Sequence, residues 1–343
     1  KTEQREFYAQ TSVLKLNQLI NTAHKKETEF DYKSAVILYQ TALTKKDDSD
    51  FDILLPKVYL KLASVYKKMS QNYEAVEYYT KAQDWYYNVS DNLKVNEIKL
   101  EIANIYFEIY KYDSAKYILG ELAKSSDLTN ELRIKINLLS GKMCDNTDKE
   151  LDLYKKSLEF ADNFVDKSVR TELYYRFAST CDEQNDMASA VIYYKKCIDT
   201  DSNPSTNKFL SESLLNTALI YDEARQSENA INYYLKSMTA DNLIKNFSGL
   251  YTASRSLSEI YAPKDEKKSL EYLKKAYEYA KELNEPYYKV DTEFEIGNFY
   301  LLRGDYQNSC KYFTLAYESA KPSLPKEYCE KIMQKINYVK AKI

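Results

Sequence analysis

Glycine and proline are scarce in this sequence. Only 5 glycines and 6 prolines occur among 343 residues, whereas average usage predicts roughly 24 and roughly 17. Hairpins and phosphate-binding loops consume glycine, so the shortage excludes most β-rich and α/β folds. The chain is 44% hydrophobic and 29% charged, which is enough apolar material for a folded core. We therefore predict an all-α protein.

Residues that carry enzyme chemistry are also few. His24 is the single histidine, and the sequence lacks the glycine-rich phosphate loops and the common hydrolase and metalloprotease motifs. The five cysteines show no C-x-x-C spacing, so we expect buried free thiols in a reducing compartment. We predict no catalytic residue, no metal site and no cofactor, and we expect that the chain is not an enzyme.

The charge balance and the hydropathy pattern exclude two further classes. With 49 basic and 52 acidic residues the net charge is −3, so we expect no direct contact with nucleic acid. No apolar run approaches the roughly 18 residues of a membrane span, and no secretory signal is visible. The chain begins with Lys1, which predicts a trimmed N-terminus and leaves a removed signal or anchor open. We expect a cytoplasmic location, and the oligomeric state stays open.

A pattern of small, aromatic and small residues, spaced four and three apart, recurs along the whole chain. Its clearest copies are Ala35/Tyr39/Ala42, Ala75/Tyr79/Ala82, Ala190/Tyr194/Cys197 and Ala230/Tyr234/Ser237. The first members of eight copies lie at 35, 75, 115, 150, 190, 230, 269 and 309, so the period is close to 40. These spacings place the three residues on one helical face. A second amphipathic stretch with its own small residue precedes each copy, which predicts an antiparallel helix pair in each repeat.

The eighth copy reads Ile296-Gly297-Asn298-Phe299-Tyr300, then Gly304-Asp305-Tyr306, then Ser309, Phe313 and Ala316. It resembles the tetratricopeptide repeat (TPR) family, although the usual repeat is shorter, at roughly 34 residues. The resemblance covers nearly the whole chain. It implies a right-handed α-α superhelix, a TPR-like solenoid of about eight helix pairs with a C-terminal capping helix. We expect one domain over 1–343, with repeats at 12–50, 52–91, 92–127, 128–162, 163–202, 203–242, 243–284 and 285–324, and the capping helix at 326–342.

The 35 tyrosines and the turns fit this architecture. In Tyr-Tyr pairs such as Tyr78-Tyr79 we expect one ring to pack between helices and its neighbour to lie at the rim. An aromatic recognition platform is the alternative. Asp and Asn cluster between the repeats, and we expect them to supply the helix caps and turns that glycine does not.

In TPR proteins the first helices of the repeats line a concave groove. We expect the groove to be faced by the residues six before, three before, one after and four after the small residue of each first helix. The candidate binding residues are Glu97, Asn104, Glu172, Tyr175, Asp182, Glu212, Leu215, Asp222 and Asn298. Glu172 and Glu212 are 40 apart, and so are Asp182 and Asp222. Such a ladder of acids beside Tyr175 suits a basic or amphipathic peptide or helix, and a solvated face without a ligand is the alternative.

We therefore predict a non-catalytic protein–protein interaction module that binds a peptide or helix in its concave groove. Family members that bind the C-terminal carboxylates of chaperones carry a clamp of Lys, Asn and Arg. Here Leu60, Leu100 and Leu215 take a central position of that clamp. The alternative is a sensory or regulatory domain of a larger bacterial signalling or transcription regulator, of the kind that joins such repeats to a kinase or a DNA-binding domain.

Overall fold

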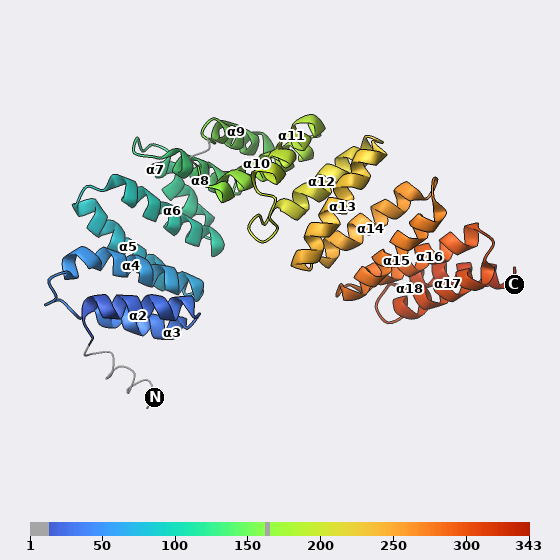
Figure 1. Cartoon of the computed structure of the whole chain (residues 1–343), viewed down its shortest axis with the longest axis horizontal. Helices are drawn as coiled ribbons and strands as arrows, with labels where there is room; N and C mark the ends of the chain where they lie inside the picture. The colour runs from blue at the N-terminus through green and yellow to red at the C-terminus, as the bar shows by residue number, and fades with distance from the viewer. Residues whose placement is uncertain (1–13, 162–164) are drawn as a thin grey trace, which may run out of the picture. The chain divides into compact units, whose positions relative to one another are not determined.

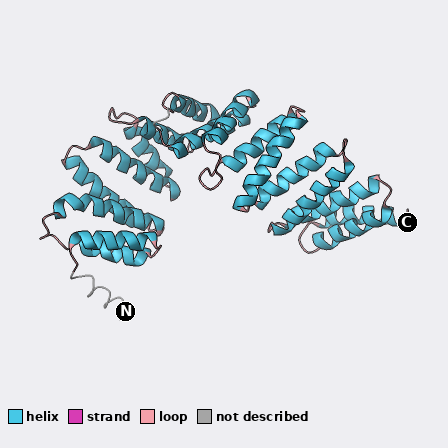
Figure 2. Cartoon of the chain, viewed as in Figure 1, coloured by secondary structure: helices cyan, strands magenta, loops and turns pink. Residues whose placement is uncertain are grey.

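The computed structural model describes residues 14–161 and 165–343 of the chain. Every regular element within those two ranges is a helix (Figure 2). Consecutive helices pack against each other in pairs joined by short turns (Figure 1). The predicted all-α, TPR-like solenoid of helix pairs is thus confirmed. Among the helices described, none is long and apolar enough to cross a bilayer.

The chain forms two compact units, Lys1–Asp162 and Asn163–Ile343. The described part of the first unit holds four helix pairs. Its first helices are α2 (Leu16–Thr28), α4 (Phe51–Lys68), α6 (Asn92–Glu108) and α8 (Asn130–Gly141). Its second helices are α3 (Tyr32–Ala42), α5 (Asn72–Asn88), α7 (Tyr112–Leu122) and α9 (Thr147–Leu158).

The described part of the second unit holds four more pairs. Its first helices are α10 (Lys167–Glu183), α12 (Leu210–Glu223), α14 (Phe247–Tyr261) and α16 (Pro286–Leu302). Its second helices are α11 (Met187–Thr200), α13 (Ser227–Ile244), α15 (Glu266–Glu282) and α17 (Tyr306–Ala320). A last helix, α18 (Lys326–Lys340), packs against α17. The eight pairs and the final helix confirm the predicted number.

The predicted repeat boundaries remain a prediction. The helix α13 extends to Ile244, past the repeat end predicted at 242. Residues 12 and 13 of the first predicted repeat, and the predicted boundary between 162 and 163, lie outside the described residues. The arrangement of all repeats as one domain stays a prediction.

The small–aromatic–small pattern forms the interlock between the two helices of a repeat. In the first repeat Ala35, Tyr39 and Ala42 are fully buried. Of the equivalent residues elsewhere, only Glu150 in the fourth repeat is not buried. The ring of the second helix lies directly against the small residue of the first. A Cβ atom built on Gly297 would lie 2.6 Å from the Phe313 ring.

The neighbouring tyrosines form a second, outer contact between the same helices. Tyr79 is buried while Tyr78 is only partly buried, as predicted for such pairs. The outer ring stacks on a tyrosine of the first helix, and the pattern returns with the repeat. The stacked pairs and their centroid distances are Tyr66/Tyr78 (5.6 Å), Tyr221/Tyr233 (5.7 Å), Tyr261/Tyr272 (5.7 Å) and Tyr300/Tyr312 (5.8 Å). These four pairs therefore brace helix pairs and use eight of the 35 tyrosines.

In six of the eight repeats the turn between the two helices contains a residue in the left-handed conformation. These residues have φ between 56° and 72° and are Phe30, Ser70, Tyr110, Asn185, Arg225 and Gly304. At the second turn the N–H of Gln71 donates to the Tyr66 carbonyl at 2.9 Å, and the N–H of Ser70 donates to the Lys67 carbonyl at 2.9 Å. This pair of bonds is the Schellman arrangement that ends helices.

Asp and Asn, which cluster between the repeats, are mostly absent from this left-handed position within a repeat. Only Asn185 is of that type, and the other non-glycine residues adopt a conformation that costs about 1 kcal/mol or more. Asp does act one residue later, as a helix cap. The Asp31 carboxylate accepts the backbone N–H of Ser34, and Asp305 accepts that of Asn308.

We expect Gly297→Ala to destabilise the second unit, because the new methyl group would collide with the Phe313 ring. Overpacking of this kind costs about 1–3 kcal/mol. Gly120→Ala is the matched control, since a Cβ there meets nothing within 4 Å and alanine favours the helix by about 0.5–1 kcal/mol. Urea unfolding followed by circular dichroism measures both changes. Equal stability of the two variants would contradict the interlock.

Candidate functional site

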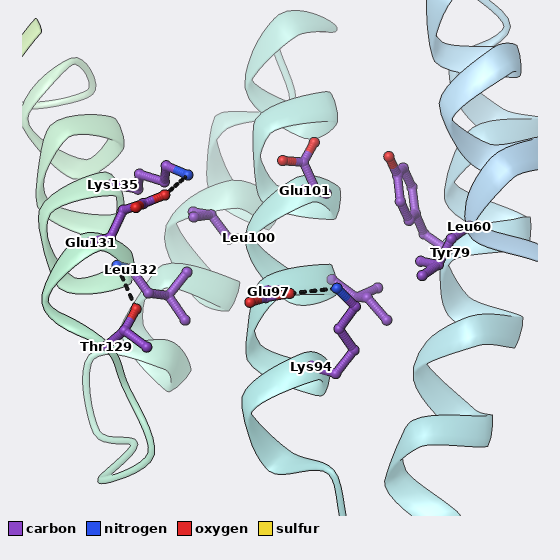
Figure 3. Close-up of a pocket in the computed structure, with 11 residues that line it drawn as sticks. Leu60, Tyr79, Lys94, Glu97, Leu100, Glu101, Thr129, Glu131, Leu132 and Lys135 are labelled. Atoms are coloured by element: carbon purple, nitrogen blue, oxygen red, sulfur yellow. Dashed lines mark hydrogen bonds and ion pairs between the residues drawn. The ribbon is translucent and has the colours of Figure 1, made fainter. Parts of the chain in front are cut away.

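The first helices α4, α6 and α8 border a hollow of about 310 Å³ in the first unit (Figure 3). Leu60, Leu100 and Leu132 give it an apolar lining. Glu97, from the predicted set, lies on its rim. Asn104 lies two turns further along α6, partly exposed, and is not among the lining residues. Of the two predicted groove residues on α6, Glu97 therefore lines a hollow over three consecutive first helices, and Asn104 lies outside it.

Four of the five charged groups on this rim form two pairs, and the fifth, Glu101, pairs with Lys67 outside the lining. Lys94 Nζ lies 2.7 Å from Glu97 Oε2, and Lys135 Nζ lies 2.5 Å from Glu131 Oε1 (Figure 3). The hydrogen bond to Glu97 raises the pKa of Lys94. A charged ligand group would have to break such a pair, whereas an apolar side chain would meet the leucines without that cost. The hollow is therefore suited to an apolar anchor.

In the second unit, α10 and α12 bring several predicted residues together. The ring of Tyr175 stacks on that of Phe209 with centroids 4.5 Å apart. Burial, followed by a hydrogen bond to Glu212, raises the pKa of Tyr175. Leu215, one turn further along α12, packs against the core beside Leu250. Tyr175 and Glu212 thus form a direct contact between neighbouring repeats.

Two cations lie over this stacked pair. The Arg176 guanidinium carbon is 5.8 Å from the centroids of both rings, and Lys208 Nζ is 4.8 Å from that of Phe209. Glu172, a predicted residue, has Arg176 Nε at 4.0 Å and Lys208 Nζ at 3.9 Å. The four positions used to predict the groove residues, which we call the positional rule, did not include Phe209, because it precedes α12. The sequence signal for Phe209 was only an aromatic residue at the start of a first helix.

Asp182 and Asp222 serve the interlock of their own repeats. The buried hydroxyl of Tyr234 donates to Asp222 Oδ2 at 3.3 Å. The Tyr194 hydroxyl accepts a hydrogen bond from Asn216 Nδ2 at 3.0 Å and interacts electrostatically with Asp182, and burial raises the pKa of Tyr194 and Tyr234 alike. In both repeats the carboxylate lies four residues after the small residue of the first helix. These two acids of the predicted ladder therefore interact with buried tyrosine hydroxyls.

Elsewhere in the chain, too, the residue four after the small residue of the first helix usually matches the central residue of the second helix: an acid accompanies a buried tyrosine. In the first repeat Tyr39 donates to Glu27, with 3.4 Å between the oxygens. Three repeats have Leu or Phe in place of the buried tyrosine, and there the matching first-helix residue is apolar. These pairs are Leu119 with Phe107, Leu273 with Ala262 and Phe313 with Leu301. The second repeat departs from it, because Tyr79 is matched by Lys67. A buried hydroxyl thus usually comes with a carboxylate.

Arg255 joins α14 to α16 through a group of carboxylates that the predicted set does not contain. Its Nη1 lies 3.2 Å from Asp291 Oδ2, and it pairs directly with Glu295 and, at 3.9 Å, with Glu259. Burial raises the pKa of Glu295 to about 7. Arg255 lies three residues before Ser258, the small residue of its helix, so the positional rule applied to the seventh repeat would have found it. Asn298 lies on α16 beyond this cluster, partly exposed.

The described residues offer no metal site, since no three or more His, Cys, Asp or Glu side chains among them are placed to hold an ion. All five cysteines are free thiols, and Cys181 and Cys197 are buried.

The repeated helix pairs and their interlock define a helical-repeat protein. Residues 56–88, 171–204 and 211–242 match the tetratricopeptide repeat family model. The chain therefore contains tetratricopeptide repeats, at α4–α5, α10–α11 and α12–α13.

Solved structures of TPR proteins share the fold. A signal transduction ATPase with numerous domains from Pyrococcus horikoshii, which has a tetratricopeptide repeat sensor, is 15% identical with a TM-score of 0.62. That match covers 97% of this chain and 51% of the other, so the chain spans about half of that protein. The apo form of RapI is 15% identical, with a TM-score of 0.61. That match covers 83% of this chain and 85% of the other.

A third match is the C-terminal part of a TPR protein from Cytophaga hutchinsonii, which is 13% identical with a TM-score of 0.52. That match covers 77% of this chain and 96% of the other. No curated protein matches the sequence. At these identities the likeness establishes the fold alone.

The tyrosine–carboxylate pair can be tested by exchanging it for the apolar pair of the eighth repeat. Asp222→Leu leaves the Tyr234 hydroxyl without its acceptor, so we expect a loss of about 1–3 kcal/mol of stability. Adding Tyr234→Phe removes the unpaired hydroxyl and should recover about 1 kcal/mol of that loss, because the effects of substitutions at interacting residues are not additive. Chemical unfolding of the two single variants and the double variant completes the cycle. Strictly additive losses would show that the hydroxyl and the carboxylate do not interact.

Proposed function

We propose that the chain is a non-catalytic protein–protein interaction module whose first helices bind a peptide or helix of another protein. The observation that carries this proposal is the hollow lined by Leu60, Leu100 and Leu132. It extends over three consecutive repeats, and the charged groups of its rim are paired within the fold. Repeat proteins use such surfaces on successive helices to bind extended partners.

The mode of binding follows from that lining. An apolar side chain of the partner would enter the hollow and lie against Leu60 and Leu100, while its backbone and polar groups would meet the rim. An amphipathic helix offers such anchors at i, i+3 or i+4 and i+7. The rim pairs Lys94–Glu97 and Lys135–Glu131 would then select against a partner that places an unpaired charge there.

The second unit supports a basic partner by a narrower argument than the full acidic ladder. Asp182 and Asp222 are engaged with tyrosine hydroxyls, so the proposal rests on Glu172 and Glu212 beside the Tyr175–Phe209 stack. Glu212 is exposed, and a partner lysine or arginine would meet its carboxylate and the aromatic rings together. No contact described above favours the alternative, a sensory domain of a larger regulator.

Peptide selection tests the hollow. We expect 12-residue peptides selected from a random phage-displayed library on the wild-type chain to carry apolar anchors. Leu60→Lys, which puts a charge into the hollow, should weaken the best peptide at least tenfold in fluorescence anisotropy. Leu93→Lys is the matched control, because Leu93 is also on a first helix but is not in the lining. A peptide that binds both variants as it binds the wild type would overturn the assignment.

A defined pair of helical probes tests the charge preference of the second unit. An 18-residue helix of Lys and Leu should bind more tightly than its Glu and Leu counterpart, and added salt should weaken it. Replacing Glu172 and Glu212 together with Lys should remove the difference. The control replaces Glu228 and Glu282, which are exposed acids outside the α10–α12 contact. Equal effects of the two double variants would show only a general charge effect.

A further inference from the structure

Four of the five glycines have a structural reason, and Gly120 has none. A Cβ on Gly141, Gly249 or Gly297 would collide with a neighbouring side chain, and Gly304 has a φ of 72°. Gly120 lies inside α7, is exposed, has no positive φ, and a Cβ there would meet nothing within 4 Å. Glycine inside a helix is unfavourable relative to alanine. In a chain this poor in glycine, neither packing nor backbone conformation accounts for this position.

Gly120 lines a hollow of about 410 Å³ in the first unit. The hollow lies between α7, the end of α8 and the start of α9, and shares no lining residue with the leucine hollow. Leu119 and Met143 contribute buried apolar side chains, 3% and 8% exposed. The missing side chain at Gly120 leaves the helix backbone open to whatever enters. The volume is that of small-molecule sites, which run from about 300 to 1,000 Å³.

The charges around this hollow differ from those around the leucine hollow. Lys116 and Lys149 line it, and in the described ranges neither has an ion pair. Lys94 and Lys135 on the other hollow are each paired with a glutamate. Asp145 is the one acid in the lining. Two uncommitted ammonium groups beside an apolar floor favour an anion attached to an apolar body.

Lys116, Lys149 and the Cys144 thiol all line the hollow. Burial and the charges of Glu150 and Asp145 raise the pKa of Cys144, and the charges of Lys116 and Lys149 both oppose that rise. Both ammonium groups therefore act on the same atom in the wall of the hollow. An anion placed near that wall would interact with both.

We propose that this hollow is a binding site for a small anionic amphiphile, a carboxylate or sulfonate on an apolar body. The anion lies between Lys116 and Lys149, and the apolar body lies on Leu119 and Met143 against the backbone of Gly120. The site shares no lining residue with the leucine hollow, so it does not depend on the proposed peptide binding.

The test uses 8-anilinonaphthalene-1-sulfonate as the fluorescent probe and sodium decanoate as the competitor, on the full chain. We expect decanoate to displace the probe from the wild type and decylamine to fail. Gly120→Leu fills the hollow and should weaken the binding of decanoate at least tenfold, whereas Gly120→Ala should weaken that binding less. Both variants should melt at or above the wild-type temperature, because a Cβ atom at this position meets no neighbour and both alanine and leucine favour a helix more than glycine does. A loss of binding then cannot come from unfolding.

Two further variants separate this site from others. Replacing Lys116 and Lys149 together with Glu should also weaken decanoate at least tenfold. Leu60→Lys in the leucine hollow should leave decanoate unchanged, so the peptide site and the amphiphile site fail independently. The proposal is overturned if Gly120→Leu binds decanoate as the wild type does, if decylamine competes equally, or if Leu60→Lys removes the binding.

Discussion

The contact on which the repeats depend is that between the central residue of the second-helix triplet, a ring in six of the eight repeats, and a small residue of the first helix. Gly297 and Gly141 show how close it is, because even a methyl group there would overlap the facing ring. Close-packed interiors have no spare volume to absorb such an overlap. The ring thereby fixes the separation and the rotation of the two helices. Every residue on the exposed face of a first helix takes its position from that contact.

The same contact decides which groove residues are available to a partner. A buried tyrosine hydroxyl needs an acceptor, and in the first and sixth repeats the carboxylate of a first helix supplies it. Where leucine or phenylalanine takes the place of the buried tyrosine, the carboxylate is replaced by an apolar residue. A repeated acid on the groove face is thus explained by the fold of its own repeat. Glu172 and Glu212 lie outside this relation, and their partners within the fold are Arg176 and Lys208 for Glu172 and Tyr175 of the neighbouring repeat for Glu212.

Much of the fold could be predicted from the sequence, because the period and the triplet spacing depend on single residues of known type. The candidate site was less predictable, because its contacts join residues of neighbouring repeats. Phe209 precedes its helix and still stacks on Tyr175, and Arg255 meets carboxylates one repeat further along the chain. The left-handed turns were missed for a different reason. Phe30 and Tyr110 are poor residues for that conformation, and the Schellman bonds of the helix ends hold them there.

The two hollows of the first unit show why the volume of a hollow does not by itself indicate which ligand binds there. Each has an apolar floor and lysines at its edge, but the lysines of the leucine hollow are already neutralised by glutamates one helical turn away. A charge that is paired within the fold has little attraction left for a ligand, while an unpaired one keeps it. The leucine hollow therefore selects for apolar shape. The hollow beside Gly120 selects for apolar shape and negative charge together, because Lys116 and Lys149 have no acid of their own among the described residues.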